Sequence, residues 1–391
     1  MATTVGDSSA GVRSWPQWQA AVIAMTTAGA RRHRRHRRLA VTSVIVVGAL
    51  LSASCASPPV QPTPVIDPAA VGIARGAGFA SNDPALLDQE MALVASTGAS
   101  WIRLDVDWSV IEAERGRYDW RDVDLVVKAA RAHDLEVLGL LAYTPSWARP
   151  AGTTSHHPPS EPRDFVEFVR AAVEHFVPLS VGTWEIWNEP NVGSFWSPEP
   201  DPAAYGLLLQ AAAEQVHAID PEGTVLSGGL APAQDAPADA EIAPLTFLRA
   251  LYESGAALAA DAIAIHPYSY PALPTDPSTA GYNTFFQLPL VHDLTVEYGD
   301  AGVHVWLTEV GAPTGTDPSA VSETDQLTIL TEALEQHARW DWTGPLFWYQ
   351  LRDSGSDLAD REQNFGLLRS DDSPKPAFGE LQRLLDASVN D

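Results

Sequence analysis

Short apolar runs alternate with longer amphipathic stretches from residue 71 onward, and this alternation restricts the possible folds more than any other feature. The runs are rich in β-branched and aromatic residues and lack a helical period, which is typical of strands buried on both faces of a parallel sheet. Eight strands are predicted, at 71–78, 100–108, 136–143, 183–191, 224–230, 262–268, 304–311 and 345–351. Helices are predicted after them, at 84–97, 119–133, 164–176, 202–219, 245–254, 285–298, 322–339 and 375–387. Eight strand–helix units predict an α/β fold, a single (β/α)8 TIM barrel with its active site at the C-terminal strand ends.

A doubly wound open sheet is the main alternative to a barrel. Many such sheets bind a nucleotide at a glycine-rich turn after the first strand. Gly72, Gly76 and Gly78 do not give the Gly-x-Gly-x-x-Gly spacing of that turn. The sequence therefore favours the barrel and predicts no cofactor.

Residues 1–55 have the pattern of an export signal. A basic cluster at 31–38 precedes the apolar run 39–51, which is shorter than the ~20 residues of a membrane-spanning helix. Met25 is an alternative start, because it would leave a basic region of ordinary length before the run. Residues 56–66 are rich in proline and read as an extended tether, so the catalytic domain is expected at 67–391.

Cys55 is the only cysteine, so no disulfide can form within the chain. Its position just after the apolar run resembles a bacterial lipobox, although Ser52 stands where that motif usually has leucine. Two outcomes stay open: lipidation at Cys55, which would anchor the protein to the outer face of the cell membrane, or cleavage and secretion. The expected location is extracellular in both cases, and the only membrane contact expected is through that anchor.

The charge of the chain limits its partners. The formal net charge is −26, and residues 1–55 hold seven of the 24 basic residues but one of the 50 acidic residues. The remainder therefore has 17 basic and 49 acidic residues, a net charge of −32. Such a surface repels nucleic acid and anionic membranes. We expect a monomer that acts on a neutral carbohydrate.

Polar residues cluster at the predicted C-terminal strand ends, where a barrel would bring them together. They are Arg103 on the second strand, Asn188 and Glu189 on the fourth, His266 and Tyr268 on the sixth, and Glu309 on the seventh. Glu189 and Glu309 can supply the two carboxyl groups that glycoside hydrolysis needs. The alternative is that both are paired structural carboxylates.

Several motifs occur in an order that resembles the clan A retaining glycoside hydrolases, in particular the family 39 and family 5 group that includes cellulases and β-xylosidases. They are IRLDVDW, GRYDW, TPSWA, WEIWNEPN, HPYSY and LTEVG. The resemblance implies that Glu189 is the acid/base and Glu309 the nucleophile, about 5–5.5 Å apart, with retention of configuration. It also implies that Arg103 lies under the nucleophile, that Tyr268 donates to it, and that Asn188 binds the sugar 2-hydroxyl. The β-sandwich common in β-xylosidases is not expected, which puts xylosidase activity in doubt.

Other residues receive smaller roles. Trp147, Trp187, Trp196 and Trp348 are candidates for stacking on sugar, while Trp108 and Trp120 are expected in the core. Glu185 should point inward as a structural partner of Arg103 or His266. The pair His156 and His157 is expected at the surface, because no further ligands complete a metal site.

The sequence thus predicts an exported retaining β-glycosidase that works by double displacement. The rival hypothesis is a catalytically silent carbohydrate-binding lipoprotein of the cell envelope on the same barrel. The sugar, its linkage and the choice between exo and endo action stay open. Simple alternation cannot aim both Asn188 and Glu189 into the barrel mouth, so the fourth strand should bulge or bend there.

Overall fold

The computed structural model describes residues 64–76 and 83–389. The predicted export segment and most of the tether lie outside these residues, and so does Cys55. Within the described ranges, no helix is both long and apolar enough to cross a membrane.

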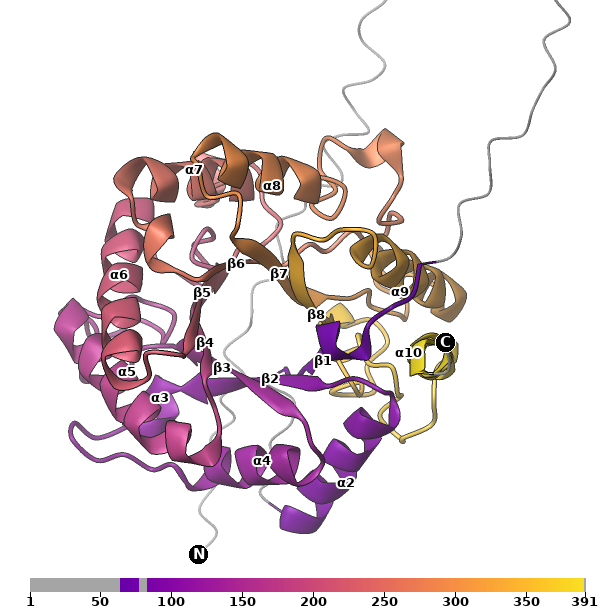
Figure 1. Cartoon of the computed structure of the whole chain (residues 1–391), viewed down its shortest axis with the longest axis horizontal. Helices are drawn as coiled ribbons and strands as arrows, with labels where there is room; N and C mark the ends of the chain where they lie inside the picture. Colours follow the sequence, from indigo (N-terminus) through magenta and orange to yellow (C-terminus); the bar gives the residue numbers. More distant parts are fainter. Residues whose placement is uncertain (1–63, 77–82, 390–391) are drawn as a thin grey trace, which may run out of the picture. The chain divides into compact units, whose positions relative to one another are not determined.

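Eight parallel strands close into a barrel in sequence order, because the last strand pairs with the first (Figure 1). The strands are β1 (Val71–Ala74), β2 (Trp101–Asp107), β3 (Glu136–Ala142), β4 (Thr183–Asn188), β5 (Thr224–Gly229), β6 (Ala262–Ile265), β7 (His304–Val310) and β8 (Thr343–Tyr349). This closure confirms the predicted (β/α)8 barrel and excludes the open sheet.

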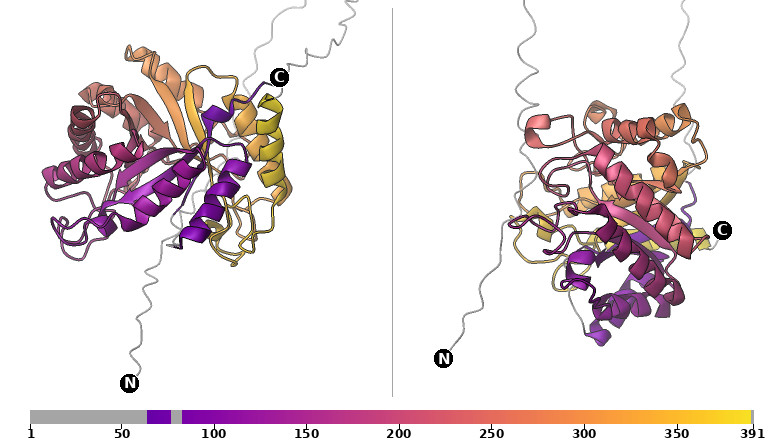
Figure 2. Two further views of the ribbon diagram at one scale, coloured as in Figure 1. Left: turned by 60° about the horizontal axis from the view of Figure 1, so that its bottom comes forward. Right: turned by 90° about the vertical axis from the view of Figure 1, so that its left-hand side faces the viewer.

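Helices surround the barrel on its outer side (Figures 1 and 2). They are α2 (Pro84–Ser96), α3 (Trp108–Ile111), α4 (Arg121–Ala132), α5 (Pro162–Phe176), α6 (Pro202–Ile219), α7 (Pro244–Ser254), α8 (Leu288–Glu297), α9 (Glu323–His337) and α10 (Pro376–Val389). Each predicted helix is present within a few residues. The short helix α3 was not predicted, because a single turn leaves no periodic pattern.

Helix starts follow the local sequence. Asp201 caps α6 by accepting hydrogen bonds from the backbone N–H groups of Ala203 and Ala204, and Pro202 occupies the first turn. Ser322 caps α9 in the same way, accepting from the N–H of Asp325. These caps satisfy donors that have no partner within the helix, which fixes where each helix begins.

Two apolar regions stabilise the barrel. The larger lies between the strands and the surrounding helices. The smaller fills the barrel interior, where Phe347 and Trp306 pack with Trp101. Gly72 leaves the space for these rings, since a Cβ there would lie 2.5 Å from Phe347. The polar site therefore rests on a packed apolar floor.

A buried lysine ties the last two strand–helix loops together. The Lys375 ammonium donates to Asp353 Oδ1 at 2.8 Å, to Thr314 Oγ1 at 2.9 Å and to the Asn364 carbonyl at 3.1 Å. Burial lowers the pKa of Lys375 and raises the pKa of Asp353, and in each case the partner's charge opposes the shift. The pair is thus held ionised mainly by its own contact, and it fixes the segment that carries Phe365.

Replacing Lys375 with methionine should destabilise the protein by about 3 kcal/mol or more, because Asp353 would remain buried without its counter-ion. Chemical denaturation followed by far-UV circular dichroism measures this loss. Arg249→Met is the matched control, because the Arg249–Glu297 pair is exposed and its loss should leave the unfolding midpoint nearly unchanged. Equal midpoints for the two variants would contradict a stabilising role for the buried pair.

Candidate active site

The guanidinium of Arg103 lies at the centre of the polar cluster inside the barrel. It donates from Nε to Glu185 Oε2 at 2.6 Å and from Nη1 to Glu309 Oε1 at 2.7 Å. It also donates from Nη2 to Glu185 Oε1 at 3.2 Å and to Asn188 Oδ1 at 3.0 Å. Burial opposes the positive charge, but the carboxylates of Glu185 and Glu309 raise the pKa of Arg103 well above its usual range. Arg103 is therefore a permanent cation that joins β2, β4 and β7.

Glu185 is a structural partner, as the sequence predicted. Its carboxylate is fully buried and accepts from the backbone N–H of Gly229 at 2.8 Å and from Thr308 Oγ1 at 3.3 Å, besides its two bonds from Arg103. With every oxygen engaged, this carboxylate is not available for a reaction. Its role is to hold Arg103 in place.

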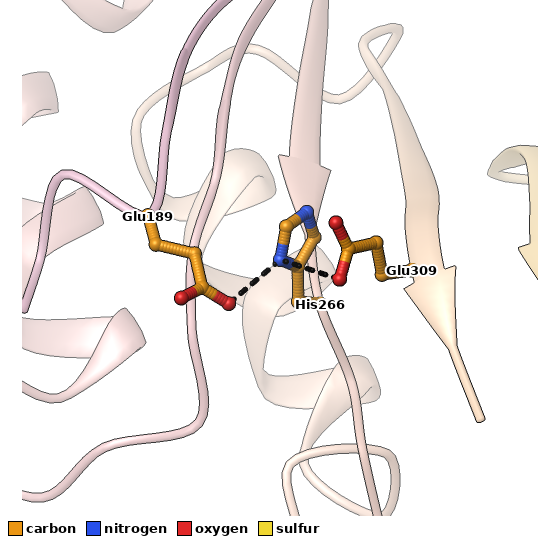
Figure 3. A group of neighbouring side chains, drawn as sticks. All are labelled: Glu189, His266 and Glu309. Atoms are coloured by element: carbon orange, nitrogen blue, oxygen red, sulfur yellow. Dashed lines mark hydrogen bonds and ion pairs between the residues drawn. The ribbon is translucent and has the colours of Figure 1, made fainter. Parts of the chain in front are cut away.

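Glu189 and Glu309 face each other across His266 (Figure 3). The Nδ1 atom of His266 lies 2.9 Å from Glu189 Oε1 and 3.7 Å from Glu309 Oε2. One oxygen of each carboxylate and a His266 nitrogen all lie within 4.8 Å of one another. Tyr268 donates its hydroxyl hydrogen to Glu309 Oε2 at 2.6 Å. The structure thus brings both candidate carboxyl groups together with Arg103, His266 and Tyr268.

The two carboxyl groups have unequal surroundings. Burial raises the pKa of Glu309, and the charge of Arg103 and the hydrogen bond from Tyr268 oppose that rise. Burial also raises the pKa of Glu189, where the contact with His266 is the main opposing influence. A proton shared by the pair is therefore better placed on Glu189, because Arg103 donates a hydrogen bond to Glu309 and acts on Glu189 only through space.

Backbone geometry aims Glu189 into the barrel. Trp187 and Glu189 have φ angles of +71° and +47°, a conformation that residues other than glycine seldom adopt. As a result Trp187 joins the core outside the barrel, while Asn188 and Glu189 both turn to the interior. The predicted bend is present, but it comes from these angles and not from an inserted residue, because Ile186 and Asn188 stay in register with β5. Such departures from preferred angles are typical of functional sites.

An irregularity in β7 aims Glu309 in a comparable way. Two residues of β7 lie between Leu307 and Val310, but only one residue of β8 lies between their partners Leu346 and Trp348. The extra residue lets Thr308 and Glu309, which are adjacent in sequence, both reach Arg103 or its partner Glu185. A bulge of this kind redirects a side chain at the end of a strand.

Gly229 makes room for the histidine. A Cβ at this position would lie 2.2 Å from His266 Nε2 and 2.8 Å from Thr308 Oγ1. Any larger residue at the end of β5 would therefore displace the imidazole from between the two glutamates.

The three ligand atoms of Glu189, His266 and Glu309 are close enough to surround a metal ion. However, both oxygens of Glu309 already accept hydrogen bonds, from Arg103 and Tyr268. A divalent cation there would also lie close to the guanidinium and be repelled by it. The donor set therefore fits a hydrogen-bonded pair of carboxyl groups better than a metal centre.

The predicted aromatic contacts need correction. Trp348 and Trp187 are fully buried, and both pack in the core between barrel and helices. Neither indole offers a face to a sugar, so the stacking role predicted for them is wrong, and Trp196, 3% exposed, is buried too. Trp147 stays partly exposed, with the Arg115 guanidinium 4.5 Å from its ring centre and its Nε1 donating to the Glu112 carbonyl.

His156 also differs from its prediction. It is half-buried, its ring stacks on Phe195 at 4.7 Å, and burial lowers its pKa. It is a packing residue of the loop after β3.

From the sequence, three residues of the mouth were assigned no role in the site. Tyr349, next to Trp348, is the β8 residue that packs on the barrel interior. Phe365 packs against Tyr268, Tyr270 and Tyr349, with ring centres 5.9, 5.6 and 5.3 Å away. Asp105 follows Arg103 by two residues on β2. Because side chains alternate along a strand, Asp105 should face the same side as Arg103, and the sequence could have predicted this. Which of Trp348 and Tyr349 faces inward depends on how β8 pairs with β1.

Comparisons with known proteins agree with the barrel. No protein-family model matches the chain, and no curated protein matches it significantly. Among solved structures, a family 39 glycoside hydrolase from Bacteroides cellulosilyticus WH2 matches with a TM-score of 0.65 and 24% identity, over 82% of this chain and 64% of that one. A monomeric beta-xylosidase from Caulobacter crescentus CB15 matches with a TM-score of 0.64 and 20% identity, over 83% and 69%. A glucosidase from Croceicoccus marinus matches with a TM-score of 0.61 and 18% identity, over 83% and 69%.

The fold resembles that of family 39 glycoside hydrolases. The chain spans less than two thirds of the length of the Bacteroides protein. At these identities the likeness establishes a shared fold, and the chemistry has to be argued from the side chains.

Tyr268→Phe should raise the pKa of Glu309, because it removes the hydrogen bond from the Tyr268 hydroxyl that favours the ionised carboxylate. Titration of carbon-13-labelled glutamate side chains by NMR, with Glu309 assigned through a Glu309→Gln variant, measures the change. Tyr270→Phe is the control, since the Tyr270 ring lies beside Tyr268 but its hydroxyl makes no hydrogen bond with Glu309. An unchanged Glu309 pKa in Tyr268→Phe would contradict the assigned hydrogen bond.

Proposed function

We propose that this protein is a retaining β-glycosidase that hydrolyses O-glycosidic bonds of a poly- or oligosaccharide. The observation that carries the proposal is a pair of carboxyl groups, Glu189 buried and Glu309 partly buried, with one oxygen of each within 4.8 Å of the other and with unequal partners. Retaining enzymes place these groups about 5–5.5 Å apart, whereas inverting enzymes leave about 6.5–9.5 Å for a water molecule. The short separation supports direct attack by one carboxylate.

Glu309 is the proposed nucleophile. The Arg103 cation and the Tyr268 hydroxyl each occupy one of its oxygens, which favours the ionised form. Its carboxylate attacks the anomeric carbon and forms a covalent glycosyl-enzyme, while the bond to the leaving oxygen breaks. Arg103 and Tyr268 hold the attacking group in one orientation, which lowers the entropic cost of the step.

Glu189 is the proposed acid/base. Burial raises its pKa and no guanidinium among the described residues contacts it, so in the proposed mechanism Glu189 carries the proton that passes to the leaving oxygen as the glycosyl-enzyme forms. Glu189 then takes a proton from water, and the resulting hydroxide attacks the anomeric carbon and releases Glu309. The contact with His266 fixes the orientation of the Glu189 carboxyl group between these two tasks.

Asn188 is the proposed ligand of the sugar 2-hydroxyl. Its Oδ1 accepts from Arg103, which fixes the amide orientation. No hydrogen bond from its Nδ2 occurs among residues 64–76 and 83–389, so the NH2 group is free to donate to the sugar. A bond at this hydroxyl gains strength in the transition state.

The rival hypothesis is a catalytically silent carbohydrate-binding protein. Such a protein would not need different hydrogen-bond partners for its two carboxyl groups. Two of the structural neighbours are a beta-xylosidase and a glucosidase. Both pentosides and hexosides are therefore among the first substrates to test. We also propose that the protein acts outside the cytoplasm, on the basis of the signal-like residues 1–55, and as a monomer.

Glu309→Gln should abolish turnover of aryl glycosides and prevent a glycosyl-enzyme from forming. Intact-protein mass spectrometry after incubation with a 2-deoxy-2-fluoro glycoside detects the adduct in the parent enzyme and its absence in the variant. The product released first by the parent enzyme, read by proton NMR, should have the anomeric configuration of the substrate. Inverted product would overturn the retaining mechanism.

Glu189→Ala should slow substrates with poor leaving groups by about 10²–10⁴-fold and activated aryl glycosides much less, because only the former need the proton. Azide should restore turnover and yield a β-glycosyl azide, since a small anion can enter the space left by the side chain. Steady-state kinetics on a series of leaving groups tests this. Equal losses across the series, with no rescue by azide, would contradict the acid/base role.

A further inference from the structure

The carboxyl group of Asp105 lies in the mouth of the barrel. On β2 the residues Ile102, Leu104 and Val106 pack in the core outside the barrel, so the alternating residues Arg103 and Asp105 face its interior. Two residues of a strand span about 6.6 Å, which places Asp105 that much closer to the C-terminal end than Arg103. Since Arg103 holds Glu309, Asp105 lies above the nucleophile on the open side.

This carboxyl group has no partner among residues 64–76 and 83–389. Asp105 makes no hydrogen bond or ion pair with any residue that the structure describes, yet its side chain is only partly exposed. Its neighbours differ, because Glu185, Glu189 and Glu309 each accept hydrogen bonds, and Asp107 accepts from Ser109 N and Oγ. Polar groups withdrawn from solvent are normally paired, so an unpaired acceptor calls for an explanation.

Electrostatics make this position costly for the folded protein. Burial and the nearby carboxylates raise the pKa of Asp105 and the charge of Arg103 lowers it, and together they bring it to about 7. The titratable and charged groups that face it are Arg103 and Asp107 on β2, Tyr143 after β3, Glu185 on β4, Glu309 on β7 and Tyr349 on β8. A carboxylate kept at such a place without a partner is better explained by a ligand than by stability.

We propose that Asp105 binds the sugar unit attacked by Glu309, by accepting hydrogen bonds from a hydroxyl or ammonium group on the side of the ring remote from the anomeric carbon. This inference rests on the proposed glycosidase function. With the anomeric carbon at Glu309, the sugar ring extends toward the open end of the barrel. Asp105 lies there and can accept a hydrogen bond from it. Above pH 7 the Asp105 carboxyl group is mostly ionised, and hydrogen bonds to a charged acceptor are among the stronger ones in proteins.

The charge of the mouth also limits the sugar class. Arg103 is already engaged with Glu185, Glu309 and Asn188, so it is not free to bind a carboxylate on the substrate. A uronic acid placed against Asp105 would meet a like charge instead. The site therefore selects a neutral or amine-bearing sugar and rejects uronic acids.

The test compares kcat/KM for the full chain and for Asp105→Ala and Asp105→Asn on aryl β-glycosides of neutral sugars, amino sugars and uronic acids. Asp105→Ala should lower kcat/KM on the preferred substrate by about 10- to 100-fold, as expected for a hydrogen bond to a charged group. Asparagine keeps an acceptor oxygen, so Asp105→Asn should lower kcat/KM by about 3- to 10-fold if the sugar group that binds it is a hydroxyl. A loss as large as that of alanine would identify an ammonium group.

Asp107→Asn is the matched control. It removes one negative charge from the same strand, two residues away, but its carboxylate is already paired with Ser109. We expect it to retain kcat/KM within about threefold, since its side chain binds no substrate. Equal losses in Asp105→Asn and Asp107→Asn would overturn the proposal, because a general loss of negative potential would then explain both.

A stability measurement separates binding from a structural role. The pKa of Asp105 is higher in the folded state than the ordinary value near 3.9, so its ionisation destabilises the fold increasingly between about pH 4 and pH 7, and the loss stays constant above that range. Asp105→Asn should therefore raise Tm at pH 8 by about 2–4 °C and raise it less at pH 5. A lower Tm at pH 8 together with lower activity would indicate a structural residue and contradict the proposal.

The proposal and the proposed function can fail separately. If the parent protein turns over no glycoside in the panel, the glycosidase function fails. If it turns over a neutral glycoside but Asp105→Ala keeps full kcat/KM, or if it prefers a uronide, the role of Asp105 fails alone.

Discussion

The site depends on one buried cation, the guanidinium of Arg103. Placing this charge inside a barrel is costly unless carboxylates surround it, and Glu185 and Glu309 supply that compensation from β4 and β7. Arg's planar fork lets it bind both carboxylates and the Asn188 amide at once. The same contacts that neutralise the buried charge thereby fix the relative positions of the proposed nucleophile and the strand that carries the proposed acid/base.

Regular strands would not deliver both glutamates. The positive φ angles at Trp187 and Glu189 and the extra residue in β7 each break the alternation of side chains at the point where a carboxyl group must turn inward. The apolar floor of the barrel and the core around the helices hold these local departures in place. Asp105 adds a further cost, an unpaired carboxyl group in a partly buried position. The strained backbone and the unpaired carboxyl group at the mouth destabilise the fold, and the apolar packing around them compensates, as expected of a functional site.

Much of this arrangement was predictable from particular residues. The apolar runs gave the barrel, because each strand is buried on both faces, and Asp201 and Ser322 marked helix starts through their caps. The cluster of Arg103, Glu185, Glu189, His266, Tyr268 and Glu309 followed from placing strand ends at one mouth. The prediction that tryptophans stack on the sugar failed for Trp187 and Trp348, because an indole at a strand end can face either the sugar or the helices. Which side it faces depends on strand register and on φ, and neither can be read from residue type alone.

The sequence by itself determined the eight-strand order and which charged groups must meet, since the local pattern fixes the strands and a closed parallel barrel gathers their C-terminal ends. Only the tertiary structure decided how those groups divide the work. Arg103 and Tyr268 both bind Glu309, His266 binds Glu189, and Asp105 has no partner within the described residues. These inequalities arise because each carboxyl group's environment is built from strands distant in sequence, whose contacts exist only once the barrel has closed.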